Sequence, residues 1–443
     1  MPHDVSQVLA MVALFLLIPF GPIVYLLFRS RLHQMPAARA LVGPFAGITV
    51  AGLLLNAPAL AVLGASVLAG LLLAYLWAAG SLRGLAVRRE CSPVRLFPGD
   101  EAVLSVRIQN AKLLPLTRLD LANPIHAEGP WAYQRLPELL DISGTVEVRE
   151  GIGPSLLIAT SMAPYQTLTR RYDLTARRRG VYTIEPARVA SGDPFAIFNR
   201  TAVLGERQEI VVYPTIYSPE DIGLPFREVL GDAIPDRALL DDPSLIAGSR
   251  EYRPGDPLNR VHWKATARTG ALSVRVHDPS TSANLLIVLN LNTAKFAWQG
   301  VDNDRMEAAI DAAASLAVWA LDRGYPIGIR SNGAIRQSSA APRVSPGASP
   351  RQATILLDHL ARLSYSGLYG GEYMLLDETH RLEARTGIIF VTPLLSPEII
   401  SVLTAPKLAN RISVVYCGRT GAPLIRGVPV HLANRAGMQR AAS

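Results

Sequence analysis

The feature that most constrains the fold of this chain is a run of uncharged residues from Ala40 to Gly80. As one helix, at about 1.5 Å per residue, the run would be roughly twice as long as a bilayer's hydrocarbon core is thick. It must therefore fold back on itself, and Asn56, Ala57 and Pro58 form the natural turn. We expect an apolar hairpin with helices over residues 41–55 and 59–79.

A second uncharged segment, Val8 to Phe28, is about as long as a helix that spans a bilayer. Membrane helices tolerate its prolines, and it lacks the basic start of a signal peptide. The sequence thus predicts three transmembrane helices, at residues 8–28, 41–55 and 59–79, in a membrane region that covers residues 1–83. The alternative is a buried core hairpin of a soluble protein, which would need an uncharged pair of helices with no polar face at residues 41–79.

Arginines flank these segments unevenly. The first connection contains Arg29, Arg31 and Arg39, and the last span is followed by Arg83, Arg88 and Arg89. The N-terminal tail and the Asn56 turn contain no Lys or Arg. The positive-inside rule then places everything beyond Ser81 in the cytoplasm. We expect a multi-pass protein of the cell inner (cytoplasmic) membrane, with the lipid bilayer as one partner.

The remaining composition is that of ordinary globular sequence. A chain of 443 residues exceeds the size of a single core, so we expect several domains. The net charge of +8 comes from scattered Arg and Lys without an aromatic-rich binding motif, which argues against a nucleic-acid partner. Cys91 and Cys417 lie far apart and suit a reducing compartment.

Residues 84–214 show short alternating runs separated by turn residues, a pattern typical of an antiparallel β-sandwich. The expected strands are Ala102–Ile108, Leu168–Leu174, Val181–Val189 and Glu209–Val212. Arg177 to Arg179 is interpreted as a solvated turn between two strands, or as a contact with lipid headgroups. Asp193 to Phe195 is interpreted as a turn with an aromatic anchor.

Residues 283–443 alternate between apolar runs and helical stretches, which predicts a mainly parallel sheet with helices on both faces. The Ser-, Pro- and Gly-rich stretch Pro342–Pro350 is expected to be a loop. The expected strands are Leu285–Leu289, Ile327–Arg330, Ile388–Val391 and Ile412–Tyr416, and the expected helices are Met306–Leu321, Ala353–Leu363 and Pro397–Leu403.

The segment between these domains, residues 215–282, contains "GSREYRPGDPLNRVHWKATARTGALSVRVHDP" from Gly248 to Pro279. Asp256 followed by proline predicts a helix start and Gly270 its end, before an alternating strand from Leu272. The i, i+4, i+8 spacing then aligns Arg260, Lys264 and Arg268 on one face. Val261 and Trp263 are expected to pack inward, with Trp263 holding the helix between the two domains.

This segment, together with "RRGVYTIEPARVASGDPFAIF" at Arg178–Phe198 and the apolar hairpin, resembles the domain of unknown function 58 family of bacteria and archaea. The resemblance implies an immunoglobulin-like sandwich followed by a domain similar to the von Willebrand factor type A fold. It also implies a MoxR-type AAA+ ATPase as a partner, because family members are typically encoded beside one. It implies no reaction.

A von Willebrand factor type A domain binds Mg²⁺ through an Asp-x-Ser-x-Ser loop after its first strand. Here the corresponding positions are Asn290, Asn292 and Ala294: Asn290 replaces the only charged ligand, and Ala294 replaces one of the hydroxyl positions. We expect neither a metal nor another cofactor. Asn292 and Thr293 are expected to form loop hydrogen bonds instead.

Three hypotheses about function remain, and one of them is a purely structural membrane scaffold. The first is a non-enzymatic adaptor that couples the ATPase to the assembly or activation of another protein complex. The second is a hydrolase that uses Asp256 and His262, although no nucleophile with an activating base is evident. For the adaptor, the expected partner-binding or interdomain residues are Arg250, Tyr252, Arg253, Gly255, Asp256, Arg260, His262, Trp263, Lys264 and Arg268.

Overall fold

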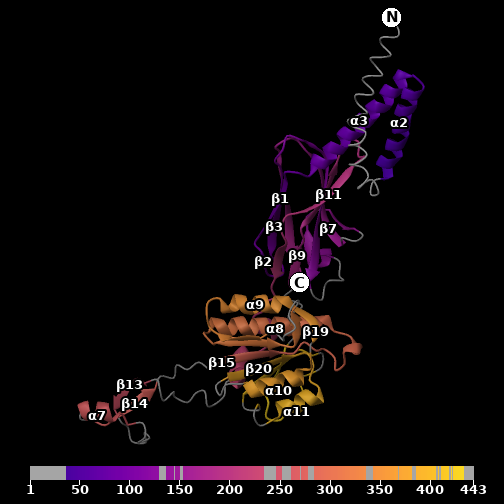
Figure 1. Ribbon diagram of the computed structural model, residues 1–443. Coiled ribbons are helices and arrows are strands. Elements are labelled where there is room, and N and C mark those ends of the chain that lie inside the picture. Colours follow the sequence, from indigo (N-terminus) through magenta and orange to yellow (C-terminus); the bar gives the residue numbers. More distant parts are fainter. Residues whose placement is uncertain are drawn as a thin grey trace.

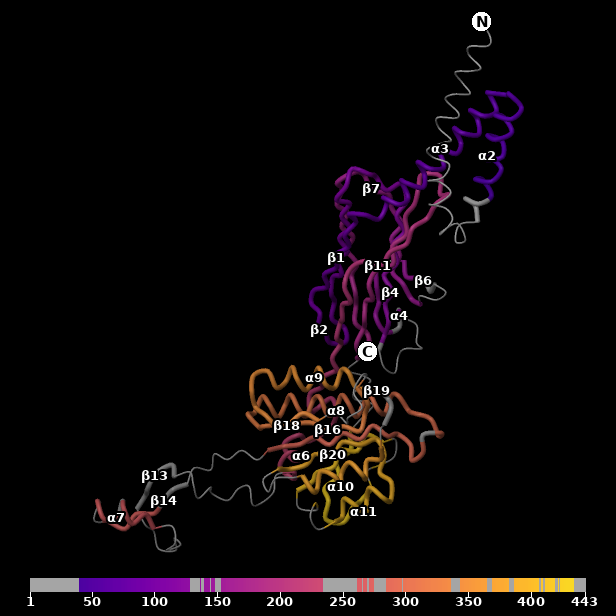
Figure 2. Tube along the Cα trace, in the orientation of Figure 1, coloured from indigo at the N-terminus to yellow at the C-terminus, as the bar shows by residue number. Residues whose placement is uncertain are grey.

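A computed structural model of the 443-residue chain has three parts in a row: an apolar helical hairpin, a β-rich region and an α/β region (Figure 1). The tube in Figure 2 follows the chain from the hairpin through the β-rich region to the α/β region. The structure describes residues 36–128, 136–143, 145–149, 153–233, 246–251, 261–269, 271–277, 284–335, 343–367, 369–381, 386–405, 408, 411–418, 421 and 423–433.

The hairpin consists of α2 (Pro36–Leu54) and α3 (Pro58–Ser81), which pack against each other. Its turn lies at Asn56 as predicted, with a positive φ of 54°. The helices meet closely at Gly64, where a Cβ atom would lie 2.3 Å from the Thr49 hydroxyl. Of the described helices, α3 alone is long and apolar enough to cross a membrane. The helix predicted at residues 8–28 lies outside the described residues.

The β-rich region (residues 85–212) has two sheets that share one apolar core. One sheet has the strand order β1-β3-β8-β5: β1 (Leu85–Ser92), β3 (Glu101–Asn110), β8 (Thr167–Ala176) and β5 (Leu140–Ile142). The other has the order β11-β10-β4-β9-β12-β2, with β7 and β6 beside β4: β2 (Arg95–Leu96), β4 (Leu116–Glu128), β6 (Val146–Arg149), β7 (Gly153–Met162), β9 (Gly180–Ile184), β10 (Ala187–Gly192), β11 (Asn199–Leu204) and β12 (Gln208–Val212). A short helix, α4 (Leu136–Leu139), precedes β5.

The single strand predicted over Val181–Val189 is wrong, because the chain forms two strands there. β9 ends at Ile184 and β10 begins at Ala187, and Pro186 between them has no amide proton for a sheet hydrogen bond. β9 pairs with β12 and the last part of β4, whereas β10 pairs with β11 and an earlier part of β4.

The α/β region (residues 284–433) has one six-stranded sheet with the order β18-β16-β15-β20-β21-β22. Every pairing is parallel except that of the edge strand β18 with β16. The strands are β15 (Asn284–Leu289), β16 (Ile327–Ser331), β18 (Arg343–Gly347), β20 (Thr386–Thr392), β21 (Ile412–Tyr416) and β22 (Val430–Leu432). The loop predicted at Pro342–Pro350 is therefore wrong for its first half: β18 pairs with β16 across a register shift, at the sheet edge where its proline is tolerated.

Helices cover both faces of this sheet, as predicted. One face packs against α6 (Phe226–Ala233), α8 (Asn303–Asp322) and α9 (Gln352–Arg362), and the other against α10 (Gly371–Arg381) and α11 (Pro397–Leu403). Residues 217–233, including the short α5 (Pro219–Ile222), belong to the first of these cores. A separate two-stranded sheet joins β17 (Gly333–Ile335) to β19 (Leu363–Gly367).

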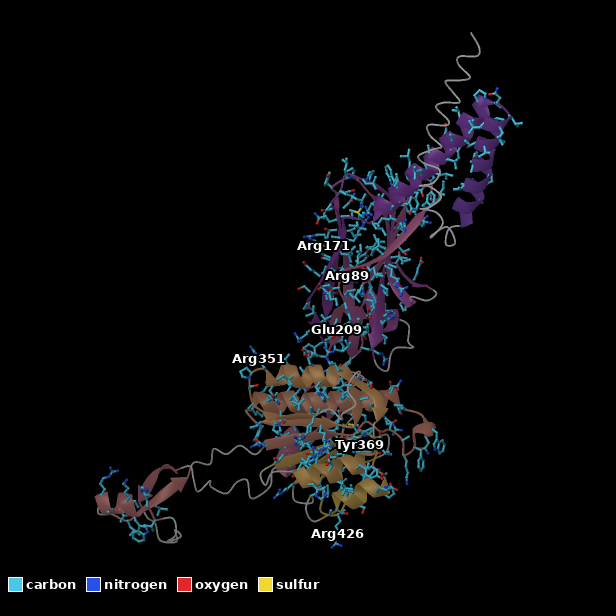
Figure 3. The ribbon with its side chains drawn as sticks, viewed as in Figure 1. Arg89, Arg171, Glu209, Arg351, Tyr369 and Arg426 are labelled. Atoms are coloured by element: carbon cyan, nitrogen blue, oxygen red, sulfur yellow. The ribbon has the colours of Figure 1, made fainter. Side chains whose placement is uncertain are left out.

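The β-rich region contacts the α/β region through charged side chains at one of its ends. Arg179, only 3% exposed, pairs with Glu307 of α8 and also donates to three carbonyl oxygens at the end of α9: those of Leu360, Ala361 and Leu363. Arg95 and the Tyr213 hydroxyl both reach Asp358 of α9, and Arg362 pairs with Glu209, which Figure 3 labels at this end of the β-rich region. The interpretation of Arg177–Arg179 as a solvated turn is thus wrong for Arg179.

Candidate functional site

Three polar residues stand at the carboxyl ends of three neighbouring parallel strands. Asn290 follows β15, Asn332 follows β16, and Thr392 is the last residue of β20. All three side chains are completely buried. Open α/β folds bind their ligands at the carboxyl edge of the parallel sheet, so we expect a functional site at this edge.

Amide hydrogen bonds link the three strand ends directly. Asn290 Nδ2 donates to Thr392 Oγ1 over 2.9 Å, and Asn332 Nδ2 donates to Asn290 Oδ1 over 2.8 Å. The Asn290 Oδ1 atom also accepts from the Asn292 amide over 3.2 Å. The three side chains therefore satisfy donors and acceptors of one another and form crosslinks between the strands.

The first turn of the neighbouring helix α10 covers this edge of the sheet. A Cβ atom at Gly371 would lie 2.8 Å from Asn290 Cγ, so the first turn of α10 sits directly on this side chain. Arg330, at the end of β16, holds the helix in place by ion pairs with Asp377 and Glu378. Tyr369, labelled in Figure 3, accepts at its carbonyl oxygen from both Asn292 and Asn332.

The degenerate metal pattern has a structural counterpart in this network. Asn292 donates to a carbonyl oxygen and Thr293 Oγ1 accepts from the Asp302 amide, so both form loop hydrogen bonds as predicted. No group of three or more His, Cys, Asp and Glu with metal-binding geometry occurs among the described residues. The edge presents amide groups, and a hard divalent cation prefers carboxylates.

An exposed aromatic loop, residues 295–301, follows directly after this edge. Its Phe296 and Trp298 rings stack with their centroids 5.9 Å apart, and Trp298 is 81% exposed. Lys295 lies 5.6 Å from the Phe296 ring and bonds to Glu398 at the start of α11, which holds the pKa of that carboxyl down to about 2. At the other end, Asp302 caps α8. The loop is thus fixed at both ends while its rings face solvent.

Sequence reasoning missed this loop, although a signal was present. Two aromatic residues in the stretch Lys-Phe-Ala-Trp-Gln come soon after a buried strand, at the edge where a metal was sought. Asn332 and Thr392 were also missed, and each stands at the end of a strand that was predicted correctly.

The segment that carries the sequence motif forms a small unit in the described residues. β13 (Ile246–Glu251) pairs antiparallel with β14 (Ser273–His277), and α7 (Trp263–Thr269) lies between them in sequence. The helix begins at Trp263 and not at Asp256, because Val261 forms a bridge with Val274 and the His262 amide donates to the Ser273 carbonyl. Figure 1 shows this unit apart from the sheet of the α/β region.

The predicted partner residues are only partly described. Val261 is buried as expected, but Trp263 is 66% exposed, so the prediction that it packs inward is wrong. Lys264 and Arg268 lie one turn apart on α7 and are both exposed. The backbone of Arg250 lies in β13, and the other predicted residues fall outside the described ranges: Tyr252, Arg253, Gly255, Asp256 and Arg260.

Of the two candidate hydrolytic residues, Asp256 lies outside the described residues. His262 is half-buried, and its Nδ1 atom has no hydrogen-bond partner among the residues that the structure describes. The described chain thus places no acid or nucleophile against this imidazole.

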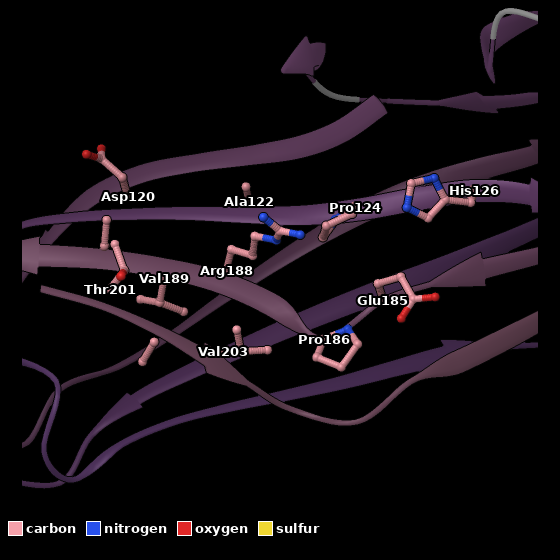
Figure 4. A pocket seen from close by; sticks show the side chains of 12 residues that line it. Asp120, Ala122, Pro124, His126, Glu185, Pro186, Arg188, Val189, Thr201 and Val203 are labelled. Atoms are coloured by element: carbon pink, nitrogen blue, oxygen red, sulfur yellow. The ribbon is translucent and has the colours of Figure 1, made fainter. Parts of the chain in front are cut away.

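A shallow pocket of about 670 Å³ lies on the β-rich region, away from this edge. Figure 4 shows Asp120 and His126 at opposite ends of it, with Arg188 between them. Asp120 pairs with Arg118, and no hydrogen bond joins the pocket's other charged side chains to one another in the described ranges. The pocket therefore lacks the convergent polar groups that define a specific ligand site.

Comparison with known proteins supports one resemblance. Residues 248–414 match the model of the family described as "Protein of unknown function DUF58". The chain is also similar to the uncharacterized protein YeaD of Bacillus subtilis (strain 168), with 24% identity over 266 residues. That similarity covers 60% of this chain, and the chain spans 59% of the relative's length.

Two solved structures are each similar to a small part of the chain. The CARDB domain of the PF1109 protein from Pyrococcus furiosus is 11% identical, with a TM-score of 0.18, over 29% of this chain and 86% of its own. A cohesin module of a Clostridium perfringens family 33 glycoside hydrolase is 13% identical, with a TM-score of 0.19, over 29% and 95%. At these TM-scores nothing about fold or function follows.

Proposed function

We propose that this chain, which belongs to the DUF58 family through residues 248–414, is a non-enzymatic, membrane-anchored adaptor that captures a MoxR-type AAA+ ATPase. The adaptor would hold the ATPase near a second protein complex for assembly or activation. The family resemblance is the reason for naming the ATPase as the partner. The main structural support for a protein-binding role is the aromatic loop at residues 295–301.

This loop has the character of a protein-binding surface. Aromatic side chains such as Trp and Phe are enriched at protein–protein interfaces, and Trp is among the residues most enriched at binding hot spots. Two large rings that remain in water leave apolar surface that a partner could bury. Phe296, Trp298 and Val301 are all exposed, and the loop beneath them is fixed by Lys295 and Asp302. A surface that is rigid before binding loses little conformational entropy on binding.

The adjacent carboxyl edge supports recognition of a protein without a metal. We infer a von Willebrand factor type A-like arrangement, in which the partner docks at the carboxyl edge of the sheet. Here the edge is closed by Asn290, Asn332 and Thr392. In such an arrangement apolar contacts from the neighbouring loop replace a metal–carboxylate bond.

The membrane part of the proposal rests on the apolar helices. The α3 helix has 24 residues, no charge and a mean hydropathy of 2.3, which is enough to cross a bilayer. The arginine placement favours a multi-pass anchor in the inner membrane, with an immunoglobulin-like β-rich region and the α/β region in the cytoplasm. Labelling of a cysteine introduced near Pro98 should then be blocked in intact cells.

The proposal is tested by removing the two rings. Phe296→Ala with Trp298→Ala in the full chain should reduce co-purification of the ATPase at least about tenfold, because hot-spot side chains contribute about 2 kcal/mol or more each. Melting should change little, since both side chains are mostly exposed.

The matched control is Ile355→Ala, which removes an exposed apolar side chain from α9 in the same region. This variant should capture the ATPase as well as the natural chain does. Equal capture by the double-ring variant and the natural chain would refute the role of the loop.

A further inference from the structure

The end of the β-rich region opposite the α/β region is built around the last turns of α3. Leu71, Tyr75 and Ala78 of the helix form one apolar cluster with Phe198 of the loop between β10 and β11. The Tyr75 and Phe198 rings meet edge to face with centroids 5.6 Å apart. The helix therefore does not leave the β-rich region through a free linker but is packed onto it.

Other loops of the β-rich region gather at the same place. Lys112, after β3, donates to the Ser81 carbonyl oxygen over 2.6 Å, and Leu114 lies next to Gly80. The amide of Tyr165, in the turn between β7 and β8, donates to the Lys112 carbonyl oxygen. Three loops thus surround the point where α3 ends.

Helix length fixes how far this end lies from a bilayer. A hydrocarbon core of about 30 Å takes about 20 residues of helix. Counted from Pro58, where α3 begins, such a span ends near Trp77. The helix residues that form one cluster with Phe198, from Leu71 to Ala78, lie before this point or within one residue of it. The loops packed around them must therefore reach the boundary between hydrocarbon and headgroups.

The tips of these loops carry large apolar side chains that face solvent. Leu113 is 73% exposed, Tyr165 68% and Phe195 75%. Two of the tips have backbone conformations that L-residues rarely adopt, with φ of 56° at Tyr165 and 57° at Ala196, next to Phe195. The Asp193 carboxylate accepts from the amides of Phe195 and Phe198, which fixes the third loop.

This geometry also explains a departure from the sequence-based prediction. Asp193–Phe195 is a turn as predicted, but Phe195 is not its buried anchor, because that place belongs to Phe198. An exposed Phe on a fixed turn gains nothing from water, whereas aromatic and leucine side chains are favoured at the headgroup level of a bilayer.

Basic groups accompany these tips. Arg83 is exposed just after α3, and the Arg200 guanidinium lies 5.4 Å from the Tyr75 ring. Together with Lys112 they supply positive charge at the level where the phosphates of anionic lipids lie.

From these observations we propose that Leu113, Tyr165 and Phe195 insert into the lipid interface around α3, so that this end of the β-rich region is a membrane-docking surface. The inference rests on the proposed anchoring of α3 in a bilayer. It adds that the β-rich region is itself immersed at headgroup depth and is not suspended above the membrane.

The test measures depth at single positions in the full chain. In three variants of the chain, cysteine replaces Leu113, Tyr165 or Phe195. Each variant is labelled with an environment-sensitive fluorophore and reconstituted into vesicles of phosphatidylcholine and phosphatidylglycerol. The native thiols of Cys91 and Cys417 are buried, so the natural chain serves as the labelling blank. Lipids with a nitroxide near the headgroup act as quenchers.

Two matched positions bracket the result. Leu63→Cys, on the exposed side of α3, reports on anchoring, and Glu101→Cys, exposed at the opposite end of β3, reports on a position away from the bilayer. We expect the three tip positions to be quenched at least about twofold more strongly than Glu101.

The outcomes separate the two proposals. If the fluorophore at Leu63 is quenched but the three tip positions are quenched no more than Glu101, membrane docking is overturned and the anchor remains supported. Absence of quenching at Leu63 as well would overturn both the anchor and the docking surface.

Discussion

The guanidinium of Arg179, in the turn between β8 and β9, donates to both carboxylate oxygens of Glu307 in α8, over 2.9 and 2.6 Å. Two residues of one chain, in two different folded regions, thus form a bidentate pair that is almost fully removed from water. The remaining Arg179 donor, Nη1, is shared among carbonyl oxygens at the end of α9, as a cation near a helix C-terminus is expected to be.

Arg179→Ala should separate the β-rich region from the α/β region. The substitution leaves a largely buried Glu307 carboxylate and three carbonyl oxygens without their donor, and breaking a buried pair in this way costs about 3–5 kcal/mol. We expect thermal unfolding of the detergent-solubilised chain to split into two transitions. The neighbouring Arg177→Ala, which removes an exposed pair with Asp141, should leave one transition. A single, unshifted transition in both variants would contradict this role of Arg179.

Stability should fall on acidification because of His359 in α9. Burial lowers the pKa of this imidazole to about 4, from 6.5 in the unfolded chain, and its Nε2 atom has no hydrogen-bond partner among the described residues. Between these two values the unfolded chain binds more protons than the folded chain. The free energy of unfolding should therefore rise from about pH 4 to 6.5, by up to about 1.4 kcal/mol per pH unit.

His359→Gln should flatten that slope, as measured by chemical denaturation at a series of pH values. His380→Gln, at an exposed histidine on α10, should leave the slope unchanged. If the slope survived His359→Gln, another group would have to be its source.

Asn290→Asp should destabilise the carboxyl edge without creating a Mg²⁺ site. The new carboxylate cannot donate to Thr392 and would be a charge in a completely buried position, which should cost about 3 kcal/mol. Asn292→Asp, at a partly exposed position of the same loop, should cost less. Titration calorimetry and melting with Mg²⁺ provide the measurement, and a melting temperature of Asn290→Asp that Mg²⁺ raises to the natural value would argue against our account.

Reversing charge on α7 tests the sequence motif. Lys264 and Arg268 are exposed and form no ion pair with any other described residue, so Lys264→Glu with Arg268→Glu should change stability by no more than about 0.5 kcal/mol. We expect this double variant to lose the proposed ATPase in co-purification at physiological salt. The matched double reversal at Arg351 and Arg426, two exposed arginines labelled in Figure 3, should not. Equal capture by both variants would show that Lys264 and Arg268 do not contribute to binding of the ATPase.

Hydrophobic periodicity predicted most of the regular elements because they bury one face or both. The predicted strand Leu285–Leu289 and the predicted helix Met306–Leu321 differ from β15 and α8 by one residue at the start of β15 and by one to three residues at the ends of α8. The β18 strand was missed because it lies at the sheet edge, where exposed and half-buried residues, including a proline, produce no apolar run.

The roles of single side chains were harder to predict than the elements that carry them. Arg178 and Arg179 are neighbours in sequence, but only Arg179 is buried, because the α/β region covers that side of the turn. Likewise, Trp263 was expected to pack inward and Phe195 to anchor its turn, but both side chains are exposed. For Arg179 the deciding partner, Glu307, is far away in sequence, and a local pattern carries no information about it.

The position of the two contacts at opposite ends of the β-rich region has a mechanical consequence. α3 joins one end and the α/β region joins the other, and β3 runs between them for ten residues, about 33 Å. In a chain held in a bilayer by α3, the β-rich region would therefore fix the distance between the lipid and the aromatic loop and limit rotation of the α/β region. A client protein could then bind the α/β region only at that distance from the membrane.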